Sequence, residues 1–145
     1  VTGVQTCALP ICLFYDGDVA GGVHAVIGNG GIDLLLGIGG APEGAISACA
    51  TKALGGFMQG RIAPQSELEM QRTLAAGHDI NKIFELDDLV ASDNTYFVAT
   101  GVTDGLLLDG VQKRGQYLRT DSIILRARSG TIRRVKADYL ASRWI

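Results

Sequence analysis

The sequence predicts an α/β fold in which strands and helices alternate. Short aliphatic runs that end at glycines alternate with helical patterns in the first half of the chain. The composition, with 47% hydrophobic and 19% charged residues, is that of a globular domain. Strand–helix–strand connections are almost always right-handed crossovers, which favours a parallel or mixed sheet. Glycine is unusually frequent, and 14 of the 20 glycines lie in the first 60 residues.

Four elements are predicted before residue 55: a strand stub at 13–15, a helix at 18–27, a buried parallel strand at 32–38 and a helix from about 43 to 54. Asp18 can cap the first helix, and the glycines after Ile27 end it. The run at 32–38 is almost wholly aliphatic, as buried parallel strands are. Pro42 suits the first turn of the second helix.

The second half predicts more strands than helices. The expected elements are a strand at 58–62, a helix at 66–76, a short strand at 82–86, a turn or short helix at 87–90, a strand at 95–100, and a hairpin of 121–127 with 131–136. Ser66 and Glu69 form a capping box. Ser129 and Gly130 provide the hairpin turn.

Charge is unevenly distributed. Residues 61–110 carry three basic and nine acidic side chains, whereas residues 111–145 carry nine basic and two acidic ones. The basic side chains near the C-terminus alternate with aliphatics, which indicates solvated strand faces. The formal net charge of −2 gives no case for nucleic acid or an anionic membrane as partner, and no apolar stretch is long enough to span a membrane.

Residues 1–11 read VTGVQTCALPI and show no helical or strand periodicity. The string matches the in-frame translation of a common sequencing-library adapter, so we expect it to be an assembly remnant rather than native sequence. Residues 12–145 would then be the C-terminal portion of a larger catalytic unit. The three cysteines form no paired framework, which favours a reducing, cytoplasmic compartment.

Two loops that each follow a predicted strand carry the candidate site: Asp16-Gly17-Asp18 and the glycine-rich segment 37–44. Ligands of open α/β sheets bind at the carboxyl ends of strands, where both loops would lie. Glycines let the backbone approach a ligand, and a helix N-terminus can receive phosphate oxygens. Glu43 offers a hard oxygen to Mg²⁺ or Mn²⁺, while Asp16 and Asp18 can accept hydrogen bonds from sugar hydroxyls.

Each element of this site also has a purely structural interpretation. Asp-Gly-Asp after a strand is usually a turn and a helix cap, and a glutamate in a first turn usually stabilises the helix dipole. The glycine-rich segment matches neither the dinucleotide-binding fingerprint nor the phosphate-binding P-loop. No Ser, Cys or His stands at a spacing typical of a nucleophilic triad.

Several blocks of the chain strongly resemble the class II fructose-1,6-bisphosphatases, some of which also hydrolyse sedoheptulose 1,7-bisphosphate. The resemblance covers about residues 14–139, and its blocks are GIDLLLGIGGAPEGAISACATKALGG (31–56), MQGRI (58–62), SDNTYFVATGVTDG (92–105) and SGTIRRV (129–135). It implies a layered αβαβα fold with a mixed sheet, of the lithium-sensitive phosphomonoesterase type.

The resemblance also implies an activity and a set of site residues. The activity is Mn²⁺- or Mg²⁺-dependent removal of the 1-phosphate of fructose 1,6-bisphosphate, a gluconeogenic step. By motif matching, Glu43 is a metal ligand, Asp16, Gly17 and Asp18 bind the sugar, and Gly40 contacts substrate through its backbone. The expected partner is a sugar bisphosphate, and the full-length protein is expected to form a homo-oligomer.

The chain departs from this family in what it lacks and in two substitutions. The other metal carboxylates of the family and its Lys-Pro-Arg-His substrate loop lie upstream of the matched region, so the chain alone is expected to be inactive. Phe57 and Leu106 stand where the family usually has an acid. Two alternatives stay open: a related sugar or inositol phosphatase, and a non-enzymatic module that binds phosphate or nucleotide.

Overall fold

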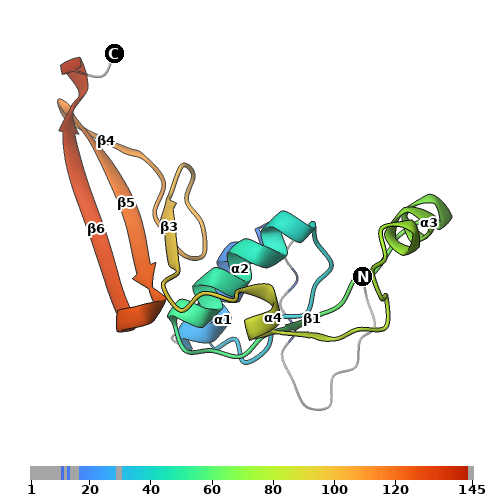
Figure 1. The fold of residues 1–145 in the computed structure, drawn as a ribbon. Coiled ribbons are helices and arrows are strands. Elements are labelled where there is room, and N and C mark those ends of the chain that lie inside the picture. The colour runs from blue at the N-terminus through green and yellow to red at the C-terminus, as the bar shows by residue number, and fades with distance from the viewer. Residues whose placement is uncertain (1–10, 12, 14–16, 29–30, 144–145) are drawn as a thin grey trace.

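The computed structural model describes residues 11, 13, 17–28 and 31–143. Helices α1 and α2 lie between an antiparallel sheet at one end and the separate helix α3 at the other (Figure 1). The α/β class is therefore confirmed. The elements are α1 (Asp18–Ile27), α2 (Ala41–Ala53), β1 (Gln59–Gly60), α3 (Glu67–Ala75), β2 (Phe84–Glu85), α4 (Leu86–Leu89), β3 (Tyr96–Thr100), β4 (Gln112–Arg114), β5 (Tyr117–Arg126) and β6 (Thr131–Leu140).

Helix α1 ends as the sequence predicts but begins differently. Gly28 adopts the left-handed conformation with φ 71° and donates its N–H to the His24 carbonyl at 3.2 Å, which closes the helix. At the other end the cap is Gly17, with φ 92°, and no side chain caps the helix. The prediction that Asp18 is the N-cap is therefore wrong. Asp18 is the first helical residue, and its carboxylate lies against Gly39 instead.

Helix α2 packs closely on α1 because the facing residues are small. A Cβ placed on Gly22 of α1 would lie 4.0 Å from the Cβ and Oγ of Ser47. Pro42 and Glu43 occupy the first turn of α2, as predicted, and Gly40 is its extended N-cap. Close helix packing therefore fixes the start of α2, which carries Glu43, relative to α1, which carries Asp18.

The larger sheet is built on the hairpin predicted around Gly130. β5 pairs antiparallel with β6 along its whole length, from Tyr117↔Leu140 to Arg126↔Thr131. Its other edge pairs with β4 and then with β3. All strand pairings among the described residues are antiparallel. The hairpin is longer than predicted, since β5 begins at Tyr117 rather than at 121.

One face of this sheet packs against the helices and forms the core. Ile123 and Leu125 of β5 are fully buried, and their side chains alternate with more exposed neighbours as the strand period of two requires. Phe97 of β3 and Leu108 of the following loop complete the sheet side. Val23 of α1 with Ala50 and Ala53 of α2 forms the helix side.

The C-terminal end of α2 is held in place by a partly buried lysine. The side chain of Lys52 is 12% exposed, and its Nζ lies 2.8 Å from Asp87 Oδ1, 2.8 Å from the Val90 carbonyl and 3.1 Å from Asp93 Oδ1. The hydrogen bond to Asp87 is the main reason that the pKa of Lys52 is raised. This cluster links α2 to α4 and to the loop before β3.

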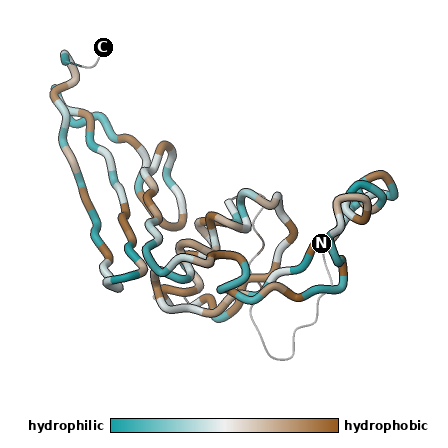
Figure 2. The backbone as a smooth tube through the Cα atoms, viewed as in Figure 1, coloured by the Kyte–Doolittle hydropathy of each residue, from teal (hydrophilic) through white to brown (hydrophobic). Residues whose placement is uncertain are grey.

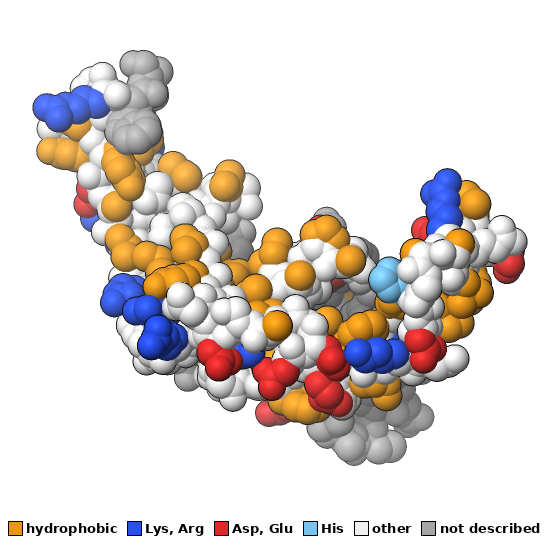
Figure 3. Space-filling model, in the orientation of Figure 1, with side chains coloured by type: hydrophobic (Ala, Val, Ile, Leu, Met, Phe, Trp, Pro, Cys, Tyr) orange, Lys and Arg blue, Asp and Glu red, His pale blue; other side chains and the backbone are white. Residues whose placement is uncertain are grey.

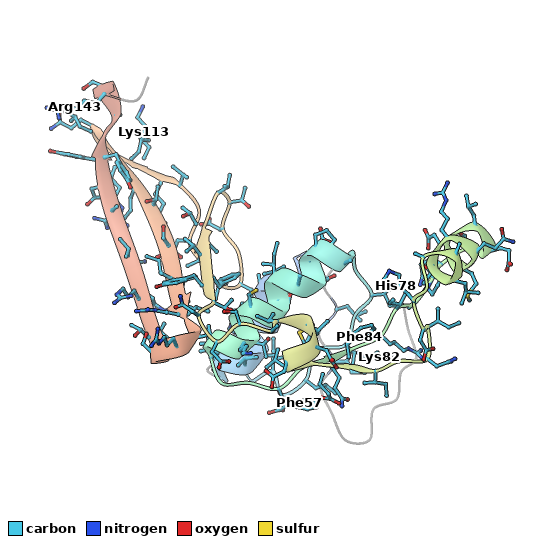
Figure 4. The ribbon with its side chains drawn as sticks, viewed as in Figure 1. Phe57, His78, Lys82, Phe84, Lys113 and Arg143 are labelled. Carbon is cyan, nitrogen blue, oxygen red and sulfur yellow. The ribbon has the colours of Figure 1, made fainter. Side chains whose placement is uncertain are left out.

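The small elements between α2 and β3 match their predicted positions. β1 and β2 form a two-stranded antiparallel ribbon, and the Lys82 ammonium lies 4.7 Å from the centroid of the Phe84 ring (Figure 4). Ser66 caps α3 by accepting the Glu69 N–H at 3.2 Å. In a capping box the Glu69 side chain would accept the N–H of Ser66 in return. Here Glu69 Oε2 accepts the N–H of Gln65 instead.

The buried parallel strand predicted at 32–38 is wrong for the described chain. These residues have no regular secondary structure, and Leu34, Leu36 and Ile38 are mostly exposed. A strand forms only where neighbouring backbone satisfies its N–H and C=O groups. In the described ranges, no strand lies hydrogen-bonded beside this segment. The strand stub predicted at 13–15 falls mainly outside the described residues.

We predict that one ion pair of the sheet makes its stability acid-sensitive. Arg119 Nη2 lies 2.6 Å from Asp138 Oδ2, and this hydrogen-bonded pair holds the pKa of Asp138 below its usual range. A lowered carboxyl pKa stabilises the fold above the unfolded value of about 4, and the contribution is lost as the pH falls through the folded value. Asp138→Asn should therefore reduce the fall in melting temperature between pH 7 and pH 3.

The control for this prediction is Asp33→Asn, at an exposed carboxylate with no ion-pair partner in the described part of the chain. Asp33→Asn should leave the pH dependence of the melting temperature as it is in the wild type. An equal fall in melting temperature for Asp138→Asn and wild type would contradict the assignment.

Candidate functional site

Asp18 reaches from α1 to the glycine-rich loop before α2. A Cβ placed on Gly39 would lie 2.8 Å from Asp18 Oδ2, so the carboxylate rests against the glycine backbone. Any side chain at position 39 would displace it. Because Asp18 does not cap its own helix, the helix-cap interpretation does not hold for Asp18.

Glu43 folds back over the same loop from the first turn of α2. A Cβ on Gly40 would collide with Glu43 Oε2. Gly40 has φ −68° and ψ 155°, so its glycine is explained by this close contact and not by backbone conformation. The two carboxylates, from two different helices, therefore flank the Gly39–Gly40 backbone at the N-terminus of α2.

The surroundings of these carboxylates leave them open to a ligand. Asp18, Gly40 and Glu43 are all exposed, and neither carboxylate has a hydrogen-bond or ion-pair partner within the described residues. No side chain caps α2. N–H groups of its first turn therefore point toward the same site as the two carboxylates. The site thus combines acceptors for hydroxyls or a cation with donors for an anion.

The structure places the remaining predicted site residues only in part. Gly17 precedes Asp18 in the left-handed conformation, which favours glycine there. Asp16 lies outside the described residues. Sequence reasoning missed the role of Lys52, which ties down the opposite end of α2. The signal was present, since Lys52 is the one Lys or Arg in the first 60 residues.

The chemistry of a divalent metal fits Glu43, but the described residues do not form a complete metal site. Mg²⁺ and Mn²⁺ prefer carboxylate oxygens, and Glu43 is exposed and unpaired among the described residues. No group of three or more His, Cys, Asp or Glu side chains in the described ranges could hold a metal ion. Glu43 therefore offers a carboxylate oxygen without companions for a metal site among the described residues.

One surface hollow among the described residues lies away from this site. It measures about 700 Å³, is lined by residues at the C-terminal end of α2 and the start of the sheet, and includes Lys52, Asp93, Asn94 and Arg128. The Lys52 ammonium there is already paired with two carboxylates. Acidic side chains gather along the lower part of the face in Figure 3, which agrees with the acidic bias of residues 61–110.

Comparison with known proteins shows which family the chain matches. Residues 1–139 match the family model described as bacterial fructose-1,6-bisphosphatase, glpX-encoded. The chain is 41% identical to a fructose-1,6-bisphosphatase class 2 of Haemophilus influenzae, over 94% of this chain and 44% of that protein. It is 36% identical to fructose-1,6-bisphosphatase 1 class 2 of Escherichia coli K12, over 97% of this chain and again 44% of the relative.

The fold and the site together define an α/β chain that brings two carboxylates to the N-terminus of one helix. It belongs to the bacterial, glpX-encoded fructose-1,6-bisphosphatase family. It spans less than half the length of the curated relatives that it matches. The family match includes residues 1–11, and the adapter origin of that segment stays a prediction.

Of the two substitutions noted in the sequence, one is clearly at the surface. Phe57, between α2 and β1, is 76% exposed (Figure 4). Leu106 is about half exposed. In the described part of the chain, no helix is both long and apolar enough to cross a bilayer.

Proposed function

We propose that this chain is part of a metal-dependent phosphatase that hydrolyses the 1-phosphate of fructose 1,6-bisphosphate. One observation carries the proposal: Asp18 and Glu43, from separate helices, both lie against the Gly39–Gly40 backbone at the start of α2. Sequence similarity to proteins named fructose-1,6-bisphosphatase class 2 supports the choice of substrate. The complete protein would have the layered αβαβα fold of lithium-sensitive phosphomonoesterases.

Each residue of the site would bind a different part of the substrate or the metal. Asp16, Gly17 and Asp18 would hold sugar hydroxyls, because carboxylate and backbone carbonyl oxygens accept hydrogen bonds. Gly40 would place its backbone against the substrate where a side chain could not fit. The first-turn N–H groups of α2 would receive oxygens of the phosphate. Glu43 would contribute one ligand to Mn²⁺ or Mg²⁺.

The proposed reaction adds water to phosphorus and breaks the bond between phosphorus and the sugar oxygen. The products are fructose 6-phosphate and inorganic phosphate. A bound divalent metal would polarise the phosphoryl group and lower the pKa of water. Asp18 and Gly40 would orient the sugar so that the water and the leaving oxygen stand in line. No covalent intermediate on the protein is needed.

Three further parts of the proposal concern the complete protein. Its missing metal ligands would come from the portion of the family polypeptide that this chain does not cover. It would act in the cytoplasm, in agreement with three cysteines whose spacing forms no paired framework in the sequence, and would assemble as a homo-oligomer. Nucleic acid and membranes are not among its proposed partners.

We expect that the chain alone does not release phosphate and that the completed chain does. The completed chain joins this sequence, in natural order, to the part of the Haemophilus influenzae relative that it does not cover; we call that part the remainder. Phosphate release is measured with Mn²⁺ or Mg²⁺ on fructose 1,6-bisphosphate, sedoheptulose 1,7-bisphosphate and an inositol monophosphate. A metal site short of ligands cannot bind its ion at ordinary concentrations.

Mn²⁺-dependent release by the isolated chain would contradict this account. A completed chain that is folded but preferentially hydrolyses inositol monophosphate would replace the proposed substrate with that of a related phosphatase. A completed chain that releases phosphate from none of the three would refute the proposed function.

A further inference from the structure

The segment between α1 and α2 exposes a row of large aliphatic side chains. Leu34, Leu36 and Ile38 are 70%, 82% and 71% exposed. They alternate along the chain, so in an extended segment they share one face. We call these three side chains the 34–38 row; Figure 2 shows the hydropathy of the segment that carries it.

The opposite side of the segment is already packed. Leu35 Cδ2 lies 3.6 Å from the position of a Cβ on Gly22 in α1, and Leu35 is half-buried. The segment is therefore held against α1 by one face only. Its other face presents apolar surface that a soluble monomer seldom leaves in water.

The backbone of this segment is also available for pairing. No hydrogen bond joins the backbone of residues 32–39 to any other described residue. An unpaired extended segment with an aliphatic face is a template for strand addition. The sequence pattern at 32–38, which resembles a buried parallel strand, is satisfied only if another strand is added there.

We infer that the 34–38 row is the docking surface for the remainder, the part of the family polypeptide that this chain lacks, which adds a strand beside residues 32–38. More than half the length of the matched relatives lies outside this chain, so an occupant of sufficient size exists. The row ends one residue before Gly39, so the docked strand would lie next to the candidate site. The inference rests on exposure and pairing and not on catalysis.

The test is association of two separate polypeptides. The 145-residue chain and the remainder of the Haemophilus influenzae relative are co-expressed, with a purification tag on the remainder alone. We expect the chain to co-purify in equal amounts. We also expect amide hydrogen exchange across residues 32–39 to slow by at least about tenfold in the complex, because those amides become hydrogen-bonded.

Two variants of the chain locate the contact. Leu36→Asp should weaken association by at least about tenfold, since docking would bury an unpaired carboxylate. Leu68→Asp, at a 56% exposed leucine of α3, is the matched control and should associate as the wild type does. Both leucines are exposed in the chain, so melting curves of the two isolated variants should match that of the wild type.

Three outcomes would overturn the inference. The tagged remainder could purify without the chain, and amide hydrogen exchange at residues 32–39 could be unchanged. Leu36→Asp and Leu68→Asp could weaken association equally. The chain alone could sediment as a dimer that protects 32–39, which would make a second copy the occupant. Association without phosphate release would refute the proposed function and leave the docking surface intact.

Discussion

Replacing Glu43 by Gln in the completed chain is expected to lower the rate of phosphate release by at least about 100-fold. The amide keeps the shape of the side chain but removes the charge that attracts a divalent cation. The half-maximal Mn²⁺ concentration should rise as well. Steady-state phosphate release over a range of Mn²⁺ concentrations measures both effects. The exposure of Glu43 makes the substitution neutral for folding.

Glu67→Gln is the matched control for Glu43→Gln. Glu67 is also an exposed glutamate in the first turn of a helix, α3, and it lies outside the proposed site. It should keep the wild-type rate and metal dependence. If Glu43→Gln retained more than half the wild-type rate, the structural interpretation would stand, in which Glu43 only stabilises the helix dipole.

Gly40→Ala is expected to reduce the rate by about tenfold or more without unfolding the protein. The added Cβ would collide with Glu43 Oε2, and a displacement of about 1 Å at a reacting centre can lower a rate 100-fold. Alanine accepts the φ of −68° found there, and the displaced group is the end of a flexible side chain. The free energy of unfolding should therefore change by less than about 1 kcal/mol.

Gly44→Ala separates this effect from loss of glycine as such. A Cβ on Gly44 meets nothing within 4 Å, and alanine in a helix interior is more stable than glycine by roughly 0.5–1 kcal/mol. Chemical denaturation should show Gly44→Ala to be at least as stable as the wild type. A Gly40→Ala protein that is destabilised by more than about 2 kcal/mol, or one that is fully active, would contradict the proposed contact.

The sequence predicted those elements whose signals are local. The first helix ends at Gly28 because glycine accepts a left-handed φ. The strand at 96–100 and the hairpin at Gly130 follow from β-branched residues and a turn glycine. The prediction at 32–38 failed because a strand is not a local structure. Its aliphatic pattern is typical of a buried strand, but no described backbone is hydrogen-bonded to it.

More of the candidate site than of its surroundings could be predicted from the sequence. Asp18, Gly40 and Glu43 were identified from loop position and motif, and the structure brings Asp18 and Glu43 to neighbouring glycines. What the sequence could not supply was the orientation of Asp18, since a helix cap and a ligand-binding carboxylate look alike in sequence. The tie between Lys52 and α4 joins residues 35 apart in the chain, and no local pattern encodes it.

The most direct test of the central claim is a crystal structure of the completed chain with Mn²⁺ and fructose 1,6-bisphosphate, with the metal located by anomalous scattering. The account predicts a Mn²⁺ peak within about 2.5 Å of a Glu43 carboxylate oxygen. It also predicts the sugar against Asp18 and Gly40 and the 1-phosphate at the start of α2. Mn²⁺ peaks that all lie more than about 4 Å from Glu43, with substrate bound elsewhere, would contradict it.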